Sequence, residues 1–157
     1  MSIYDEIKAD HAHHRELLER IAATSGASDE RKAAWEEFYY DVKSHAAAEE
    51  ETFYSKLMSK TWGQDAARHS VEEHAEMDDL MEELNDMDMS VGAWLTKFKE
   101  LKHEYEHHME EEEEEIFAKA KEVIPAKELK GYGEEFRKRK AQEIKIVDQK
   151  AEEKLED

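Results

Sequence analysis

Two of the His-x-x-x-Glu motifs in the sequence lie on apolar helix faces, and they limit what the chain can fold into. They are His45-Ala-Ala-Ala-Glu49 and His108-Met-Glu-Glu-Glu112. An α-helix turns by about 100° per residue, so side chains four positions apart lie on one face, one turn apart. Imidazole and carboxylate groups together suit iron, manganese or zinc. The motifs therefore predict two helices that each offer a histidine and a glutamate to a metal site.

An internal repeat relates the two motifs. Three pairs of candidate ligands are each 63 positions apart: His45 and His108, Glu49 and Glu112, and His11 and His74. Further pairs have the same interval: Asp10 and Glu73, Leu17 and Leu80, Trp35 and Phe98, Phe38 and Leu101, and Tyr54 and Phe117. This self-similarity indicates two copies of one helical hairpin. A twofold-like arrangement of the copies would bring both sets to one centre, with enough donors for two metal ions bridged by both carboxylates.

Composition and apolar spacing predict an all-α fold. The chain has 5 glycines and a single proline, Pro125, while Glu, Lys, Ala and Leu are abundant. This composition is typical of long helices. Apolar residues recur at helical spacing in four segments before Pro125, and the segments are separated by breaker clusters at 24–28, 62–63 and 86–90. Ser2, Ser28 and Ser90 are the expected N-caps, and Pro125 is expected to end the fourth helix.

Short connections between amphipathic helices favour antiparallel neighbours. We therefore predict an up-down-up-down four-helix bundle over residues 1–124, built from the two repeated hairpins. Residues 125–157 form a C-terminal helical tail in this interpretation.

The candidate ligands lie on the apolar faces of the predicted helices. They are His11, His45, Glu49, His74, His108 and Glu112. Burying an unpaired carboxylate costs several kcal/mol, so two of them in a bundle of this size need a partner. A shared cation would satisfy both.

With these motifs the sequence resembles the hemerythrin family, specifically bacterial single-domain proteins of the HHE cation-binding type. The resemblance rests on Asp10-His11, His45 to Glu50, Glu73-His74 and His108 to Glu112, and it covers Ser2 to Val123. It implies a four-helix bundle around two non-haem iron ions (Fe²⁺/Fe³⁺) with an oxo or hydroxo bridge. It also implies an open coordination position that binds dioxygen, peroxide or nitric oxide. Manganese and zinc remain open from the donor types alone.

The sequence departs from the blood-type hemerythrins of that family. Those proteins carry two histidines four apart on the third helix and His-x-x-x-x-Asp on the fourth. Here Asp78 stands four positions after His74, and Glu112 stands four after His108. His14 lies about one turn from His11, and three roles stay open for it: a fifth imidazole ligand, a group that orients a ligand, or an ordinary polar core residue. Its repeat partner is Met77.

The repeat distinguishes the candidate ligands from the other histidines of the chain. His107 competes with His108, but the interval of 63 and the apolar stripe through Tyr105 select His108. His107 is rotated about 100° away from that face. We expect the other histidines to lie on the surface: His13, His69 and His103. Tyr105 is the aromatic residue expected nearest the metals.

Net charge and hydropathy indicate which partners and which compartment to expect. The formal net charge is -19, which disfavours nucleic acid and anionic membranes as partners. No apolar run approaches about 20 residues and residues 1–8 lack a signal-peptide profile, so we expect a cytoplasmic protein. The family resemblance suggests binding of dioxygen or a related small ligand for sensing, delivery or detoxification. The alternatives are a di-iron redox enzyme, such as a peroxide-decomposing one, and a regulatory interaction protein that depends on metal or redox state.

The tail differs from the bundle in charge. Phe136-Arg-Lys-Arg-Lys140 is basic, and only thin apolar spacing follows at Ile144, Ile146, Val147 and Leu155. We expect a helix that packs loosely on the bundle or projects from it. It is either a solubilising extension or a docking element for a protein partner or a second copy of the chain.

Overall fold

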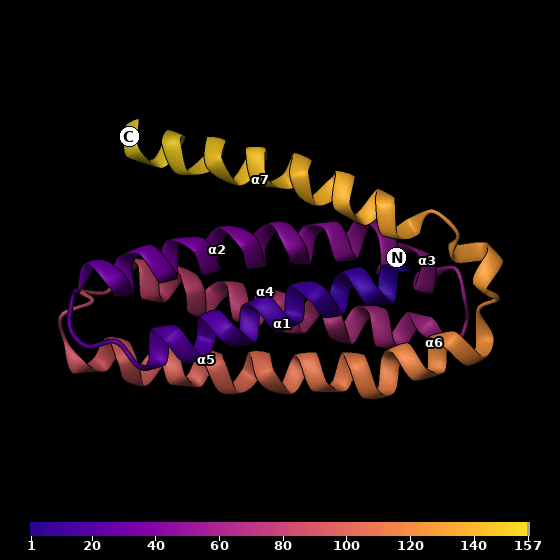
Figure 1. Ribbon diagram of the computed structural model, residues 1–157, viewed down its shortest axis with the longest axis horizontal. Helices are drawn as coiled ribbons and strands as arrows, with labels where there is room; N and C mark the ends of the chain where they lie inside the picture. Colours follow the sequence, from indigo (N-terminus) through magenta and orange to yellow (C-terminus); the bar gives the residue numbers. More distant parts are fainter. Residues whose placement is uncertain (157) are drawn as a thin grey trace.

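The computed structural model describes the backbone of residues 1–156 and the side chains of residues 1–148. Four long helices run up-down-up-down, and a fifth lies across the outside of the bundle (Figure 1). Their bounds are α1 Ile3–Ala22, α2 Asp29–Glu49, α4 Gly63–Asp86, α5 Gly92–Glu111 and α7 Tyr132–Glu156. No strand occurs in residues 1–156, so the all-α prediction is confirmed.

A π-helical turn lies at each candidate glutamate, beginning directly after Glu49 and at Glu112 itself. The turn η1 Glu50–Tyr54 leads from α2 into α3 Ser55–Met58, and η2 Glu112–Ile116 leads from α5 into α6 Phe117–Val123. A π-turn adds a residue to a helix and occurs often at functional sites. The two turns lie within one position of each other in the repeat, so in both copies the side chains after the glutamate are rotated from the positions that a straight α-helix gives.

Two of the three predicted N-caps are confirmed. The hydroxyls of Ser2 and Ser28 accept from the backbone N–H groups of Asp5 and Arg31. Ser90 is not a cap, because its backbone N–H and hydroxyl both donate to Asp88 Oδ1, at 2.8 and 2.6 Å. The helix α5 begins after Val91 without a side-chain cap.

Pro125 ends the fourth helix as predicted. The helix α6 stops at Val123, and the short 3₁₀ turn η3 Ala126–Leu129 follows the proline. This turn leads the chain toward α7 (Figure 1).

The buried layer of histidines divides the hydrophobic core into two clusters. One cluster is on the side of the α1–α2 and α4–α5 loops and the other is at the opposite end. In α1, for example, Ile7 belongs to the second cluster and Leu17 to the first, while His11 and His14 lie between them. The apolar clusters therefore close the polar layer from both ends.

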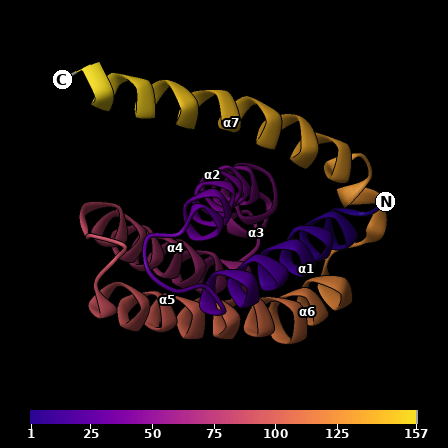
Figure 2. The same cartoon turned by 60° about the vertical axis from the view of Figure 1, so that its left-hand side comes forward.

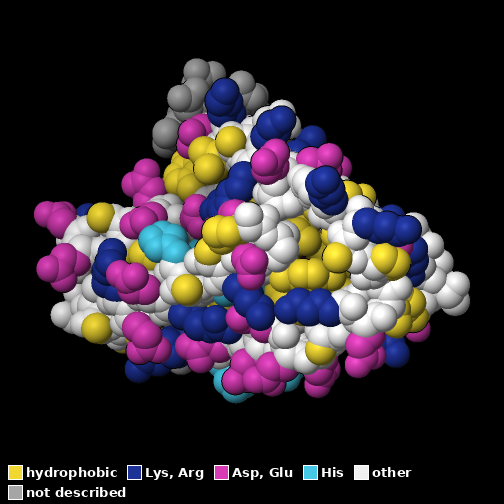
Figure 3. Space-filling model, turned by 45° about the vertical axis from the view of Figure 1, so that its right-hand side comes forward, with side chains coloured by type: hydrophobic (Ala, Val, Ile, Leu, Met, Phe, Trp, Pro, Cys, Tyr) yellow, Lys and Arg dark blue, Asp and Glu magenta, His cyan; other side chains and the backbone are white. Residues whose placement is uncertain are grey.

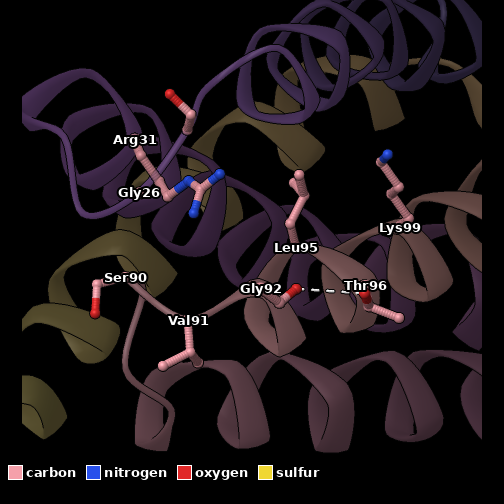
Figure 4. Close-up of a pocket in the computed structure, with 9 residues that line it drawn as sticks. Gly26, Arg31, Ser90, Val91, Gly92, Leu95, Thr96 and Lys99 are labelled. Atoms are coloured by element: carbon pink, nitrogen blue, oxygen red, sulfur yellow. Dashed lines mark hydrogen bonds between the residues drawn. The ribbon is translucent and has the colours of Figure 1, made fainter.

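Arg31 ties the two loops together at one end of the bundle. Its Nε and Nη2 donate to the hydroxyl and carbonyl of Thr24 at 2.9 and 2.8 Å, and Nη1 donates to the Met89 carbonyl at 2.8 Å. Its guanidinium carbon lies 4.9 Å from the centre of a Trp94 ring. A cavity of about 200 Å³ beside it is lined by Gly26, Ser90, Val91, Gly92 and Lys99, among others (Figure 4). This cavity belongs to the loop end and contains none of the candidate ligands.

The first part of α7 packs closely on the bundle. Phe136 is fully buried, and its ring centre lies 5.5 Å from that of His45. Arg137 Nη1 donates to Asp10 at 2.8 Å, and Lys140 pairs with Asp10 and Asp41 at 3.1 and 2.9 Å. Farther along, the helix diverges from α2 (Figures 1 and 2). The expected tail helix is thus present and part of the core, although the side chain of Leu155 lies outside the described residues.

The surface mixes both signs of charge. Acidic and basic side chains are interspersed on the face that Figure 3 shows, with hydrophobic side chains between them. Within the described residues, every helix is too short or too polar to cross a membrane.

Candidate metal centre

The bundle brings the six candidate ligands into one buried layer. His11 comes from α1, His45 and Glu49 from α2, His74 from α4, and His108 and Glu112 from α5 and its π-turn. The two glutamates are fully buried, and the four histidines are between 0% and 8% exposed.

Each glutamate faces one histidine from each hairpin. The Oε2 of Glu49 lies 3.1 Å from His45 Nε2, and its Oε1 lies 3.3 Å from His74 Nε2. In Glu112, Oε1 lies 3.1 Å from His11 Nε2 and Oε2 lies 3.6 Å from His108 Nε2. Each carboxylate therefore lies between imidazoles that come from different hairpins.

The donor atoms form two groups that share Glu49. The first consists of His11, His45, Glu49 and Glu112, and the second of Glu49, His74 and His108. Within each group the donor atoms lie within 4.8 Å of one another. Such nitrogen and oxygen donors, with no sulfur, suit iron, manganese or zinc.

The centre also holds buried polar atoms that lack a hydrogen-bond partner. They are His11 Nε2, Glu49 Oε1 and Glu112 Oε1, whose close approaches to the facing groups do not have hydrogen-bond geometry. An unsatisfied buried polar group costs about 1–3 kcal/mol, and more when it is charged. Because all three atoms point into one layer, a shared cation would satisfy them together. The residues present therefore fit a bound metal cation.

The Nδ1 atom of each of the four candidate histidines, which points away from the centre, pairs with a further carboxylate. The Nδ1 atoms pair with carboxylates as follows: His11 with Glu113 at 3.2 Å, His45 with Asp10 at 2.7 Å, His74 with Glu50 at 3.2 Å, and His108 with Glu73 at 3.0 Å. Such pairs fix the imidazole so that Nε2 is free to bind metal. The four carboxylates obey the same interval of 63, as Asp10 with Glu73 and Glu50 with Glu113. Sequence reasoning gave them no role, although the repeat could have identified them.

The carboxylates set the protonation of the layer. Burial lowers the pKa of His11, but Glu112 and Glu113 outweigh it and raise the pKa to about 9. For His74, Glu49 and Glu50 likewise outweigh burial and raise the pKa to about 10. Burial raises the pKa of Glu49, but His45 and His74 hold it well below the usual value. The metal-free centre thus pairs carboxylates with protonated imidazoles.

His14 lies outside both groups. Its Nε2 is 2.6 Å from Asp41 Oδ2, and its Nδ1 is 2.6 Å from the Tyr105 hydroxyl. Burial lowers the pKa of His14 to about 4, so the ring is neutral. With Asp41 accepting from Nε2, Nδ1 accepts from the Tyr105 hydroxyl. Among the three roles left open, this geometry favours a polar core residue next to the centre, since neither nitrogen is free for a metal.

Tyr54 is the phenol that reaches the carboxylates. Its hydroxyl donates to Glu112 Oε2, while Tyr105 bonds to His14 instead. Sequence reasoning favoured Tyr105 and missed Tyr54, which follows Glu49 by five positions. On a straight α-helix that spacing turns the side chain about 140° away. The π-turn removes this mismatch, and both Phe53 and Tyr54 are buried.

The other histidines lie at the surface as expected. His107 and His69 both approach the half-buried Glu111, at 3.7 and 3.4 Å. His13 pairs with Glu37 at 3.1 Å. His69, Glu73 and Glu111 also form a partly exposed group of donor atoms next to the buried layer.

Known proteins share both the sequence pattern and the fold. A family model described as "Hemerythrin HHE cation binding domain" matches residues 2–120. A crystal structure of a hemerythrin HHE cation binding domain-containing protein from Mycobacterium kansasii superposes with a TM-score of 0.82. That likeness covers 93% of this chain and 89% of the other at 24% identity, and it shows a common fold.

A curated relative is also similar over most of the chain. The protein named DNA nickase from Nostoc sp. (strain PCC 7120) is 24% identical over 141 residues. The match covers 90% of this chain but only 40% of the relative, so this chain spans less than half the length of that protein. Because the family model matches most of the chain, from residue 2 to residue 120, the chain belongs to the hemerythrin HHE cation-binding domain family.

Proposed function

We propose that this protein holds two iron ions in the buried layer and binds dioxygen, or a related ligand such as peroxide or nitric oxide, at an open iron position. Its output is sensing, delivery or detoxification. The observation that supports this proposal is the pair of bridging carboxylates, Glu49 and Glu112, each with an Oε1 atom that lacks a hydrogen-bond partner.

Each set of residues has its own part in this function. The ligands are His11, His45, Glu49, His74, His108 and Glu112. The iron pair, when bound, supplies a redox-active position that accepts a small ligand. The outer carboxylates keep each imidazole in the orientation that directs Nε2 inward, and the two hydrophobic clusters exclude water from the layer. Tyr54 holds one Glu112 oxygen through its hydroxyl.

Metal analysis and an optical spectrum test the proposal. The purified protein is expected to carry about two iron ions per chain, in line with its two donor groups. Admission of air to the reduced protein should produce a charge-transfer band, and removal of dioxygen should reverse it if the protein carries or senses oxygen. A protein that binds zinc or manganese in preference to iron, and shows no such band, would contradict the proposal.

One observation favours a redox enzyme as the second candidate. Both nitrogens of His14 are engaged, so the layer offers four imidazoles and not five. Fewer imidazole ligands favour turnover over reversible carriage, and peroxide decomposition is the reaction we propose. Irreversible bleaching of the band together with consumption of hydrogen peroxide would select this alternative in the same experiment.

DNA cleavage is not part of the proposal. The relative named DNA nickase is more than twice as long as the matched region, because the match covers 40% of it. The net charge of -19 also repels a phosphate backbone.

Metal loading should release protons. The pKa values of His11 and His74, about 9 and about 10, lie above the ordinary histidine value of 6.5, so both rings are protonated at pH 7 without metal. A ligating imidazole must be neutral, so binding displaces these protons and apparent affinity should rise with pH up to that range. Calorimetric titrations at pH 7 in buffers of different ionisation enthalpy should report at least about two protons released per chain.

The same pKa shifts predict how the metal-free protein depends on pH. Because the folded values are raised, their contribution to stability is fully present below pH 6.5 and is lost as pH rises to about 10. Metal-free protein should therefore unfold more easily in alkali, as thermal denaturation would show. Constant stability from pH 6.5 to 10 would mean that the two histidines are not protonated in the fold.

A further inference from the structure

A cleft between α2 and α4 reaches the candidate metal centre from one side. Its volume is about 290 Å³. Its lining is mainly apolar and includes Val42, Ala46, Ala47, Val71, Ala75 and Met77. His74 and Glu50 also line it, and their side chains pair with each other at 3.2 Å. The cleft therefore ends at the imidazole whose other nitrogen, Nε2, faces Glu49.

The repeat supplies an internal control for this cleft. The equivalent surface lies between α5 and α1, where larger side chains stand at the repeat positions of Val42 and Ala46, and one of similar size stands at that of Met77. Val42 corresponds to Tyr105, Ala46 to Met109, and Met77 to His14. Tyr105, Met109 and His14 are all buried, with exposures of 2%, 0% and 0%. Tyr105 and Met109 therefore add bulk at the positions that Val42 and Ala46 occupy beside the cleft.

The two ends of the layer differ accordingly in exposure. His74 keeps 8% of its surface exposed, whereas His11 keeps 0%. Over His11 the side chains of Arg15 and Glu113 form an ion pair. A depression of about 410 Å³ does exist on the α1–α5 side, but charged residues such as Arg15, Glu106 and Glu110 line it, and no candidate ligand does.

The lining also selects the kind of molecule that enters. Small apolar side chains form the walls, and the rim lysine, Lys43, is already paired with Asp78 and Glu82 at 3.1 and 3.0 Å. An entering anion would find no free cation there and would meet the carboxylate of Glu50 and the net charge of -19. An uncharged diatomic molecule has no such cost.

We propose that an uncharged diatomic ligand, of the size of dioxygen or nitric oxide, reaches the centre through the cleft between α2 and α4. It arrives at the His74 half, while the His11 half is closed. This inference rests on the proposed function. Ala46 is the residue that keeps the route open, because its repeat partner Met109 closes the equivalent one.

Introducing methionine at position 46, as found at the repeat position Met109, tests the route. In Ala46→Met, nitric oxide should bind to the reduced, iron-loaded protein at least about tenfold more slowly in stopped-flow measurements, with unchanged iron content. Ala75→Met adds the same bulk on the α4 wall and should also slow binding. The matched control is Ala12→Met, since Ala12 is the exposed repeat partner of Ala75 on α1, and it should bind at the wild-type rate. Equal rates in Ala46→Met and wild type would overturn the proposal.

Xenon separates this inference from the proposed function. Crystals of the wild-type protein under xenon pressure should show the atom in the cleft whatever metal is bound, and crystals of Ala46→Met should not. A wild-type protein without iron but with xenon in the cleft would refute the iron proposal and retain the route. Iron without xenon in the cleft, and with unaltered nitric oxide rates, would refute the route alone.

Discussion

Replacing Glu49 with glutamine is expected to remove metal from both positions at once. Its two oxygens face His45 and His74, which belong to different hairpins, so a single carboxylate serves both donor groups. Glutamine keeps the shape but lacks the negative charge that a pair of divalent ions requires. The metal content should fall from about two ions per chain to below about half an ion, measured by elemental analysis after gel filtration.

The control lies in the acidic run 110–115, which also contains Glu112. Glu114→Gln removes a charge two positions from Glu112, but Glu114 is exposed and lies outside both donor groups. That variant should keep its full metal content, whereas Glu112→Gln should resemble Glu49→Gln. Two ions retained in Glu49→Gln would refute the bridging assignment.

Replacing Phe136 with alanine is expected to produce a large loss of stability that does not depend on metal. The ring is fully buried in the hydrophobic cluster that it shares with α1 and α6, and it packs edge-on to His45. Truncation of a buried phenylalanine costs about 3–5 kcal/mol. For a chain of this length the melting temperature should fall by roughly 10 °C.

Thermal denaturation of metal-free and metal-loaded protein would measure this effect. Ile146→Ala on the same helix is the control, because Ile146 is 39% exposed and should change the melting temperature little. If both variants melt alike, α7 is an appendage and does not support the core. Docking of a partner or of a second copy on α7 stays a prediction, and these measurements do not depend on it.

The repeat explains why so much of the site could be predicted from the sequence. Ligands placed by helical spacing depend only on which face of a helix they occupy, and the interval of 63 selected His108 over His107 without knowledge of packing. In the structure His108 is 2% exposed and faces His74, with their Nε2 atoms 3.1 Å apart.

What could not be predicted depends on local breaks in helical regularity or on tertiary contacts. Tyr54 was missed because the π-turn changes the register after Glu49. Glu113 was missed because it lies in a run of acidic residues that helical spacing does not resolve, although its interval of 63 from Glu50 distinguishes it. The prediction that Ser90 is a cap was wrong because Asp88 accepts both of its hydrogen bonds, and residue type alone does not reveal that contact.

The C-terminal helix makes the two halves of the centre electrically unequal. Asp10, behind His45, faces two cations, Arg137 and Lys140, while its repeat partner Glu73, behind His108, lies near the histidines His69 and His107 and has no ion pair with a lysine or arginine among the described residues. A cation beside the outer carboxylate withdraws electron density from the imidazole that it supports. Ions held by the two halves would therefore differ in reduction potential, with the lower oxidation state favoured beside α7. If the centre holds two iron ions as proposed, a duplicated hairpin can in this way give them different preferred oxidation states.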